Sequence, residues 1–221
     1  MTDLNLNRAE FIRSAAQSGQ FIHNMLPKVA FAGKSNVGKS SVINRLLNRK
    51  QFARVGATPG KTVHVNYFLI DGRLYLIDLP GYGFAKASGD ERRRWAGMIE
   101  GYLQESENLK HVFLLTDIRH EPTEDDRQMA QYLRHYGLPF TVIATKADKV
   151  SKAEKSRNLP VIFRKLVVQP WQLMTYSSET NEGRDGLISR LQDILKPAEP
   201  VPDGIQIEEG LTFDDGPTKE M

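Results

Sequence analysis

The sequence predicts an α/β protein in which helices cover both faces of a mostly parallel sheet. From Lys28 onward, short runs rich in β-branched and aromatic residues alternate with longer stretches of helical periodicity. This alternation is typical of a three-layer fold in which helices connect successive parallel strands. With 40% hydrophobic residues in a chain of 221, the protein can bury the core of one large domain.

Six strands and five helices are expected. The strands are residues 29–32, 63–70, 74–78, 111–116, 140–145 and 171–176. The helices are residues 39–47, 90–104, 124–136, 152–166 and 183–195, and Pro122 with Thr123 suits the start of the third. Asp71 and Gly72 are typical of a tight hairpin turn between the second and third strands. Those strands should be antiparallel neighbours, so the expected six-stranded sheet has one antiparallel edge strand.

Three segments are expected along the chain. Residues 1–26 form an N-terminal extension whose short amphipathic piece, 9–16, should pack outside the main sheet, and residues 27–196 form the domain. Residues 197–221 are rich in proline, glycine and acids without any period, and this composition predicts disorder.

Charge is unevenly divided between these segments. The tail has seven acidic residues and one lysine, which leaves residues 1–196 with a net charge of about +9 where the whole chain has +3. A basic body favours a polyanionic partner such as nucleic acid, although a simply basic, soluble domain would have the same charge.

The composition excludes several classes of protein. The chain has no cysteine, so disulfides, thiolate metal sites and cysteine nucleophiles are excluded, which fits a reducing compartment. No apolar run approaches the length needed to cross a bilayer. Charged residues interrupt the first 26 positions, which therefore lack the apolar centre of a secretory signal. We expect a cytoplasmic protein without a membrane segment.

The segment from Gly33 to Ser40 matches the phosphate-binding pattern G-x-x-x-x-G-K-[ST] between an expected strand and an expected helix. Backbone N–H groups of such a loop surround phosphate oxygens, Lys39 should reach the β- and γ-phosphates, and the Ser40 hydroxyl should bind Mg²⁺. A chance glycine-rich turn is the alternative. The residues expected to bind phosphate here are Gly33, Lys34, Ser35, Asn36, Val37, Gly38, Lys39 and Ser40.

A second candidate segment, Asp78-Leu79-Pro80-Gly81, closes the third expected strand. An aspartate at that strand end can hold Mg²⁺ through water, and the Gly81 N–H can bond a γ-phosphate. Hydrolysis would remove that contact and release the loop. By itself the pattern also fits an ordinary turn or helix cap.

Guanine selection is expected from Thr145-Lys146-Ala147-Asp148. A carboxylate at Asp148 can accept hydrogen bonds from guanine N1–H and from its amino group, whereas adenine offers no such pair of donors. Lys146 would lay its aliphatic stem along the base. Ser177-Ser178-Glu179 would complete the base pocket through backbone contacts. The alternatives are a surface turn for the first segment and a helix-capping serine for the second.

Thr62 is the hydroxyl expected to complete Mg²⁺ coordination when GTP is bound, with Thr58 as the rival. Gly60, Lys61 and Thr62 directly precede a strand that anchors them, and Pro59-Gly60 provides a hinge. The expected metal ligands are therefore Ser40 and Thr62. The expected catalytic groups are Lys39, Thr62 and Gly81.

In this order the motifs resemble the EngB family of bacterial ribosome-assembly GTPases, which have a P-loop fold. The resemblance covers residues 7–195 and rests on four strings: Gly33 to Ser41, Thr58 to Thr62, Asp78 to Gly83 and Asp117-Ile118-Arg119-His120. It implies a GTP-hydrolysing switch that helps to mature the large ribosomal subunit, with links to cell division and septation. Thr145 stands where GTPases commonly have asparagine, and its hydroxyl can still donate one hydrogen bond towards the base.

Two features bear on the rate of hydrolysis. Tyr82 stands where many small GTPases place the glutamine that orients water, so we expect slow intrinsic hydrolysis that a ribosomal partner stimulates in trans. Asn36 either coordinates K⁺ at the position of an arginine finger or only shapes the loop.

Arg92-Arg93-Arg94 is the densest basic run, which suits either a solvated helix face or a nucleotide-gated contact to ribosomal RNA. We expect a monomer that binds GTP, GDP and a large-subunit precursor. One rival function is a septation factor that acts mainly through protein partners. Another is a metabolic ATPase or small-molecule kinase, against which Asp148 argues.

Overall fold

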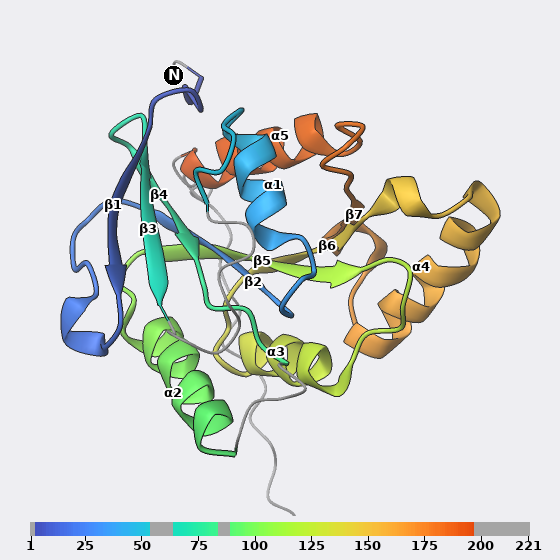
Figure 1. Ribbon diagram of the computed structural model, residues 1–221, viewed down its shortest axis with the longest axis horizontal. Helices are drawn as coiled ribbons and strands as arrows, with labels where there is room; N and C mark the ends of the chain where they lie inside the picture. Colours follow the sequence, from blue (N-terminus) through green and yellow to red (C-terminus); the bar gives the residue numbers. More distant parts are fainter. Residues whose placement is uncertain (1–2, 54–63, 84–88, 197–221) are drawn as a thin grey trace, which may run out of the picture.

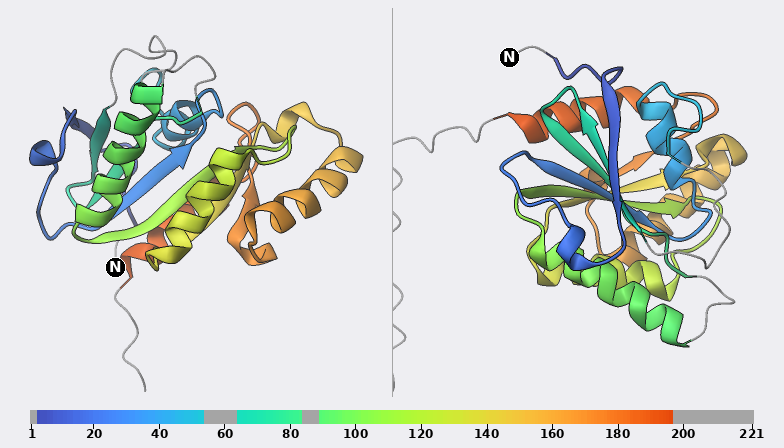
Figure 2. Two further views of the ribbon diagram at one scale, coloured as in Figure 1. Left: turned by 90° about the horizontal axis from the view of Figure 1, so that it is seen from below. Right: turned by 60° about the vertical axis from the view of Figure 1, so that its left-hand side comes forward.

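The computed structural model describes residues 3–53, 64–83 and 89–196. In this part of the chain one seven-stranded sheet is covered by helices on both faces (Figures 1 and 2). The strands are β1 (Ala9–Ala15), β2 (Lys28–Gly33), β3 (Val65–Ile70), β4 (Leu74–Asp78), β5 (Leu109–Asp117), β6 (Phe140–Thr145) and β7 (Leu173–Thr175). Their spatial order is β1-β3-β4-β2-β5-β6-β7. The predicted α/β class is confirmed.

The helices divide between the two faces of the sheet. They are α1 (Lys39–Leu46), α2 (Gly89–Glu105), α3 (Glu124–His135), α4 (Lys152–Leu166) and α5 (Arg184–Leu195). Helices α1 and α5 share one apolar core with the sheet, and α2, α3 and α4 share the other. Each predicted helix agrees with its observed range to within one residue at either end. Short 3-10 turns occur at Ser18–Gln20 (η1), Ala147–Lys149 (η2) and Pro170–Gln172 (η3).

The N-terminal segment corrects the predicted sheet. Residues 9–16 do not pack outside it, because Ala9–Ala15 forms the edge strand β1 and pairs antiparallel with β3, from Ala9 opposite Ile70 to Ala15 opposite Val65. The sheet therefore has seven strands instead of six. Strand β3 is antiparallel to both of its neighbours. The edge strand of the sheet is β1, whereas the prediction made β3 the edge strand.

Local turn and cap signals match the structure well. Asp71 and Gly72 have left-handed φ angles of 52° and 66° and connect β3 to β4 as an antiparallel pair. Thr123 caps α3 through a reciprocal capping box with Asp126. The last strand is shorter than expected, because Pro170–Gln172 forms a 3-10 turn and leaves only Leu173–Thr175 to pair with β6.

The parallel strands bring the predicted motifs to one edge of the sheet. Strands β4, β2, β5 and β6 run parallel as neighbours, so the loops that follow Asp78, Gly33, Asp117 and Thr145 leave from the same edge. In α/β proteins, ligands bind outside the carboxyl ends of such strands. None of the helices in the described ranges is both long and apolar enough for a membrane span.

Candidate nucleotide-binding site

The phosphate loop connects β2 to α1, as the pattern predicted. Gly38 has a φ of 106°, which a residue with a Cβ rarely adopts, and it lies directly before the first residue of α1. Asn36 also has a left-handed φ, of 65°. This conformation supports a role of Asn36 in shaping the loop, and its K⁺ contact stays a prediction.

The loop after β4 lies against the phosphate loop. The Ser35 N–H donates to the Tyr82 carbonyl at 2.8 Å, and the Tyr82 N–H donates to the Gly33 carbonyl at 3.2 Å. The Ser35 hydroxyl donates to the Gly81 carbonyl at 3.0 Å. A Cβ at Gly81 would lie 3.0 Å from Ser35 Oγ and 3.2 Å from its Cα, so this close approach favours glycine. Gly81 therefore lies directly against the phosphate loop, and its contact with a γ-phosphate stays a prediction.

An ion pair joins these two loops. Lys39 Nζ bonds the Asp78 carboxylate, and both side chains are about nine-tenths buried. Leu79 is buried beside it, and its N–H donates to the Phe31 carbonyl of β2 at 3.1 Å. The first residue of α1 and the last residue of β4 thus place a cation and a carboxylate together at a helix N-terminus, which favours anions.

The oxygen donors near this pair suit Mg²⁺ bound together with a nucleotide. The described residues contain no cluster of three or more histidine, cysteine or acidic side chains that could hold a metal alone. Mg²⁺ is usually bound through one or two protein oxygens, with substrate phosphates and water as the other ligands. The Asp78 carboxylate and the Ser40 hydroxyl at the start of α1 match that donor set.

The predicted base-recognition residues also come together. The Ser177 hydroxyl donates to Asp148 Oδ1 at 2.7 Å, and the Ala147 N–H donates to the Tyr176 carbonyl at 3.1 Å. The Ser177 hydrogen bond is the main cause that lowers the pKa of Asp148, which keeps this carboxylate an acceptor. Ser177 Oγ also accepts from the N–H groups of Glu179 and Thr180, both at 3.1 Å. Ser177 thus closes a local turn and does not cap α5, whose N-cap is Gly183, and its role in the base pocket stays a prediction. Ser178 is half-buried and Glu179 is exposed.

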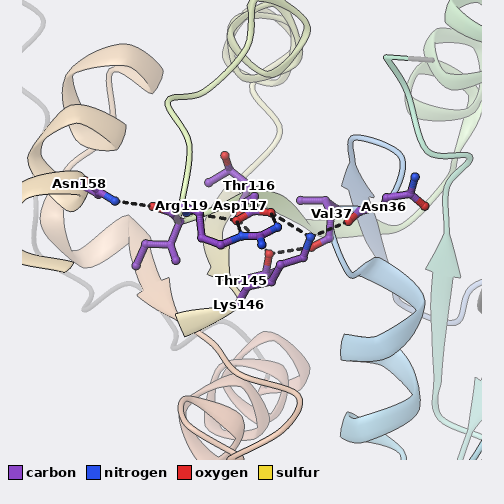
Figure 3. Close-up of polar contacts among 9 residues, drawn as sticks. Asn36, Val37, Thr116, Asp117, Arg119, Thr145, Lys146 and Asn158 are labelled. Atoms are coloured by element: carbon purple, nitrogen blue, oxygen red, sulfur yellow. Dashed lines mark hydrogen bonds and ion pairs between the residues drawn. The ribbon is translucent and has the colours of Figure 1, made fainter. Parts of the chain in front are cut away.

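Thr145 has a different role from the one expected. Its hydroxyl was predicted to donate towards the base, yet its Oγ1 lies 2.7 Å from the Val37 carbonyl and 3.1 Å from the Thr116 carbonyl (Figure 3). The side chain is buried between the ends of β5 and β6. The hydroxyl proton is therefore donated to a carbonyl within the protein. Through these contacts the Thr145 side chain joins the phosphate loop to the sheet.

Lys146 connects the base-recognition segment to the phosphate loop. It has a left-handed φ of 61°, and its Nζ donates to the Asn36 carbonyl at 2.8 Å. The same Nζ lies 2.9 Å from Asp117 Oδ2. From the sequence, no role was assigned to Asp117 or to Arg119, which follows two residues later. A carboxylate at the end of a parallel strand with an arginine two positions on was the sequence pattern that could have indicated this contact.

Tyr82 is turned into the protein. Its side chain is buried, and its hydroxyl donates to Asp126 Oδ1 at 2.9 Å. Burial, together with the Asp126 charge and hydrogen bond, raises the pKa of Tyr82 well above its usual value. The phenol thus contacts the start of α3 instead of replacing a water-orienting glutamine.

Some predicted residues cannot be placed. Gly60, Lys61 and Thr62 lie outside the described residues, as does the rival Thr58. Arg92 to Arg94 lie within α2, but the side chains of Arg92 and Arg94 are outside the described part of the chain. The expected tail at 197–221 is outside it as well.

Comparisons with known proteins show the family of this chain. Residues 28–146 match the family model described as "50S ribosome-binding GTPase". The "Probable GTP-binding protein EngB" of Pelotomaculum thermopropionicum is 48% identical over 186 residues, which cover 84% of this chain and 94% of that protein. The same-named protein of Bacillus subtilis is 45% identical over 183 residues, or 82% of this chain and 94% of that protein.

A solved structure shows the same fold. The crystal structure of a probable GTP-binding protein engB superposes with a TM-score of 0.64 at 24% identity, and the match covers 76% of this chain and 98% of that one. The family model and the relatives together support GTP binding and GTP hydrolysis by this chain. The chain belongs to the EngB family of GTP-binding proteins.

Proposed function

We propose that this GTPase is a molecular switch that binds the large ribosomal subunit or its precursor and assists subunit assembly, a role on which normal cell division depends. The family description, which names 50S ribosome binding, carries this proposal. The net charge of about +9 on residues 1–196 adds support, because a positive surface attracts the phosphates of RNA. A septation factor acting mainly through protein partners remains the rival.

At the nucleotide, each loop has a separate task. Backbone N–H groups of Gly33 to Ser40 bind the phosphates, and Lys39 neutralises charge on the β- and γ-phosphates. Ser40 and Thr62 would hold Mg²⁺, with Asp78 contributing through water. When bound, Mg²⁺ would offset phosphate charge that develops during transfer.

The remaining residues sense and select the nucleotide. The Gly81 N–H bonds the γ-phosphate, so its loop responds to hydrolysis. Asp148 selects guanine, Lys146 covers the base, and Ser177-Ser178-Glu179 closes the pocket. Since Tyr82 does not orient water, hydrolysis by the isolated protein is slow and a ribosomal partner accelerates it.

Helix α2 begins directly after the loop that follows Asp78, which makes its basic run the proposed contact to ribosomal RNA. Arg92→Glu with Arg93→Glu should weaken cosedimentation with large subunits in a non-hydrolysable GTP analogue. The slope of log affinity against log salt should fall by about one for each phosphate that the variant no longer neutralises. The control is Lys152→Glu with Arg157→Glu, which reverses two exposed charges on α4.

Two results would contradict this proposal. Equal salt slopes for the wild type and the α2 variant would contradict the proposed RNA contact. Normal large subunits in sedimentation profiles after depletion of the protein would contradict the assembly role and favour the septation factor.

A further inference from the structure

One carboxylate outside the predicted site bonds the base-recognition segment directly and reaches the phosphate loop through it. Asp117 is the last residue of β5, and 14% of its side chain is exposed. Its Oδ1 accepts hydrogen bonds from the Arg119 backbone N–H at 3.1 Å and from Arg119 Nε at 2.9 Å. Its Oδ2 lies 2.7 Å from Arg119 Nη2 and 2.9 Å from Lys146 Nζ (Figure 3). Both oxygens therefore have two donors each.

The Lys146 contact is the one that reaches across the site. Arg119 is two residues from Asp117, so their contacts fix the local turn after β5. Lys146 comes from the segment after β6, and its Nζ also donates to the Asn36 carbonyl in the phosphate loop. Asp117, Lys146 and Asn36 thus form a chain of contacts from the end of β5, through the base-recognition segment, to the phosphate loop.

The charges let Asp117 stabilise this arrangement. Its carboxylate lies between two cations, Arg119 and Lys146, which would repel each other without it. Burial alone would raise the pKa of Asp117, but hydrogen bonds from Arg119 and Lys146 outweigh burial and lower that pKa to about 2. The carboxylate is therefore charged at neutral pH.

We propose that Asp117 is a positioning residue for the binding of guanine nucleotides. It holds Lys146 against the phosphate loop and so fixes the distance between the base-recognition segment and that loop. The proposal rests on the proposed function of Lys146 and Asp148. A link formed before the ligand arrives lowers the ordering cost of binding. It involves no group that senses the γ-phosphate, so GTP and GDP should benefit equally.

Asp117→Asn is the informative variant. An asparagine oxygen can still accept the Arg119 N–H, which keeps the local turn, while its NH₂ group faces Lys146 donor to donor. The Thr145 hydroxyl still ties the same loops through Val37 and Thr116. We expect the dissociation constants for GTP and GDP to rise by about tenfold each, with their ratio unchanged.

A double-mutant cycle separates positioning from general destabilisation. Lys146→Ala should weaken binding, and adding Asp117→Asn to it should weaken binding no further, because Asp117 acts through Lys146. The matched control is Glu121→Gln, which removes one negative charge four residues away. Glu121 pairs with Lys165 of α4, and its side chain is 64% exposed. This control should bind nucleotide as the wild type does.

The outcomes distinguish this inference from the proposed function. If Asp117→Asn binds like the wild type, or if the two losses add, the positioning role of Asp117 is wrong. If Lys146→Ala and Asp148→Asn leave GTP binding unchanged, the proposed base-recognition site itself is wrong.

Discussion

Asp148 provides the sharpest prediction for a single residue. Asp148→Asn converts one of two acceptors into a donor, which suits xanthine, whose C2 carries an oxygen where guanine has an amino group. The Ser177 hydroxyl can still donate to the asparagine oxygen. We expect GTP affinity to fall by about a hundredfold, the order for one hydrogen bond to a charged group, and XTP affinity to rise.

Competition of GTP and XTP against a labelled nucleotide measures this exchange of base preference. Asp193→Asn is the control, because Asp193 is an exposed carboxylate that pairs with Lys196 at the end of α5. If Asp148→Asn retained the wild-type order of the two nucleotides, Asp148 would not contact the base.

The sequence predicted site residues where a local pattern sets both identity and position. The adjacency of Lys39 and Asp78 follows from two motifs at the ends of neighbouring parallel strands. The hydrogen-bond partner of the Thr145 hydroxyl could not be predicted, because it depends on how β6 aligns with β5 and on which backbone carbonyls face the side chain. The same holds for Asp117, whose partner comes from another strand end.

At the scale of elements, Tyr82 links the loop after β4 to helix α3. Tyr82→Phe would leave buried Asp126 Oδ1 without its tyrosine donor, while Oδ2 keeps its bonds to Thr123. Leaving a buried acceptor without that donor costs about 1–3 kcal/mol. We expect the free energy of unfolding without nucleotide to fall by this amount in a urea titration.

Tyr136→Phe is a matched control for this substitution. The Tyr136 hydroxyl accepts from Gln104 at 2.9 Å, and 44% of the residue is exposed, so water can take the place of the hydroxyl as the acceptor for Gln104. Similar losses of stability in the two variants would show that the link between Tyr82 and Asp126 contributes nothing specific.

Elements with local signals were predicted, and β1 was not. The turn at Asp71 and the cap at Thr123 each depend on a few adjacent residues, which is why both could be recognised. Strand β1 is buried only at its two ends, Ala9 and Ala15, and it pairs with residues 50 or more positions later. A short, mostly exposed segment of this kind can have the same composition in a strand and in a surface helix.

At the scale of the whole molecule, buried His111 makes stability depend on pH. Burial, with a smaller effect of Arg190, lowers the pKa of His111 to about 4, whereas an unfolded histidine has a pKa of about 6.5. Unfolding therefore takes up a proton between these values. The contribution of His111 is complete above pH 6.5 and is lost as pH falls towards 4, by about 3 kcal/mol in all.

Urea unfolding at a series of pH values tests this contribution. His111→Gln can keep a hydrogen bond to Thr141, whose Oγ1 lies 2.9 Å from His111 Nε2, but it cannot be protonated. The variant should show a shallower loss of stability between pH 6.5 and 4. His23→Gln changes a half-exposed histidine and serves as the control. Parallel curves for His111→Gln and the wild type would contradict the prediction.

The hairpin after β3 and the nucleotide-binding loops leave the sheet at opposite ends of its strands. The hairpin at Asp71 and the start of β1 at Ala9 lie at the edge opposite Asp78, separated from it by the five residues of β4. At about 3.4 Å per residue that separation is roughly 17 Å. A tether or affinity handle attached beside the hairpin would therefore leave the phosphate and base loops free, so that surface-immobilised protein can be titrated with nucleotide and with ribosomal particles.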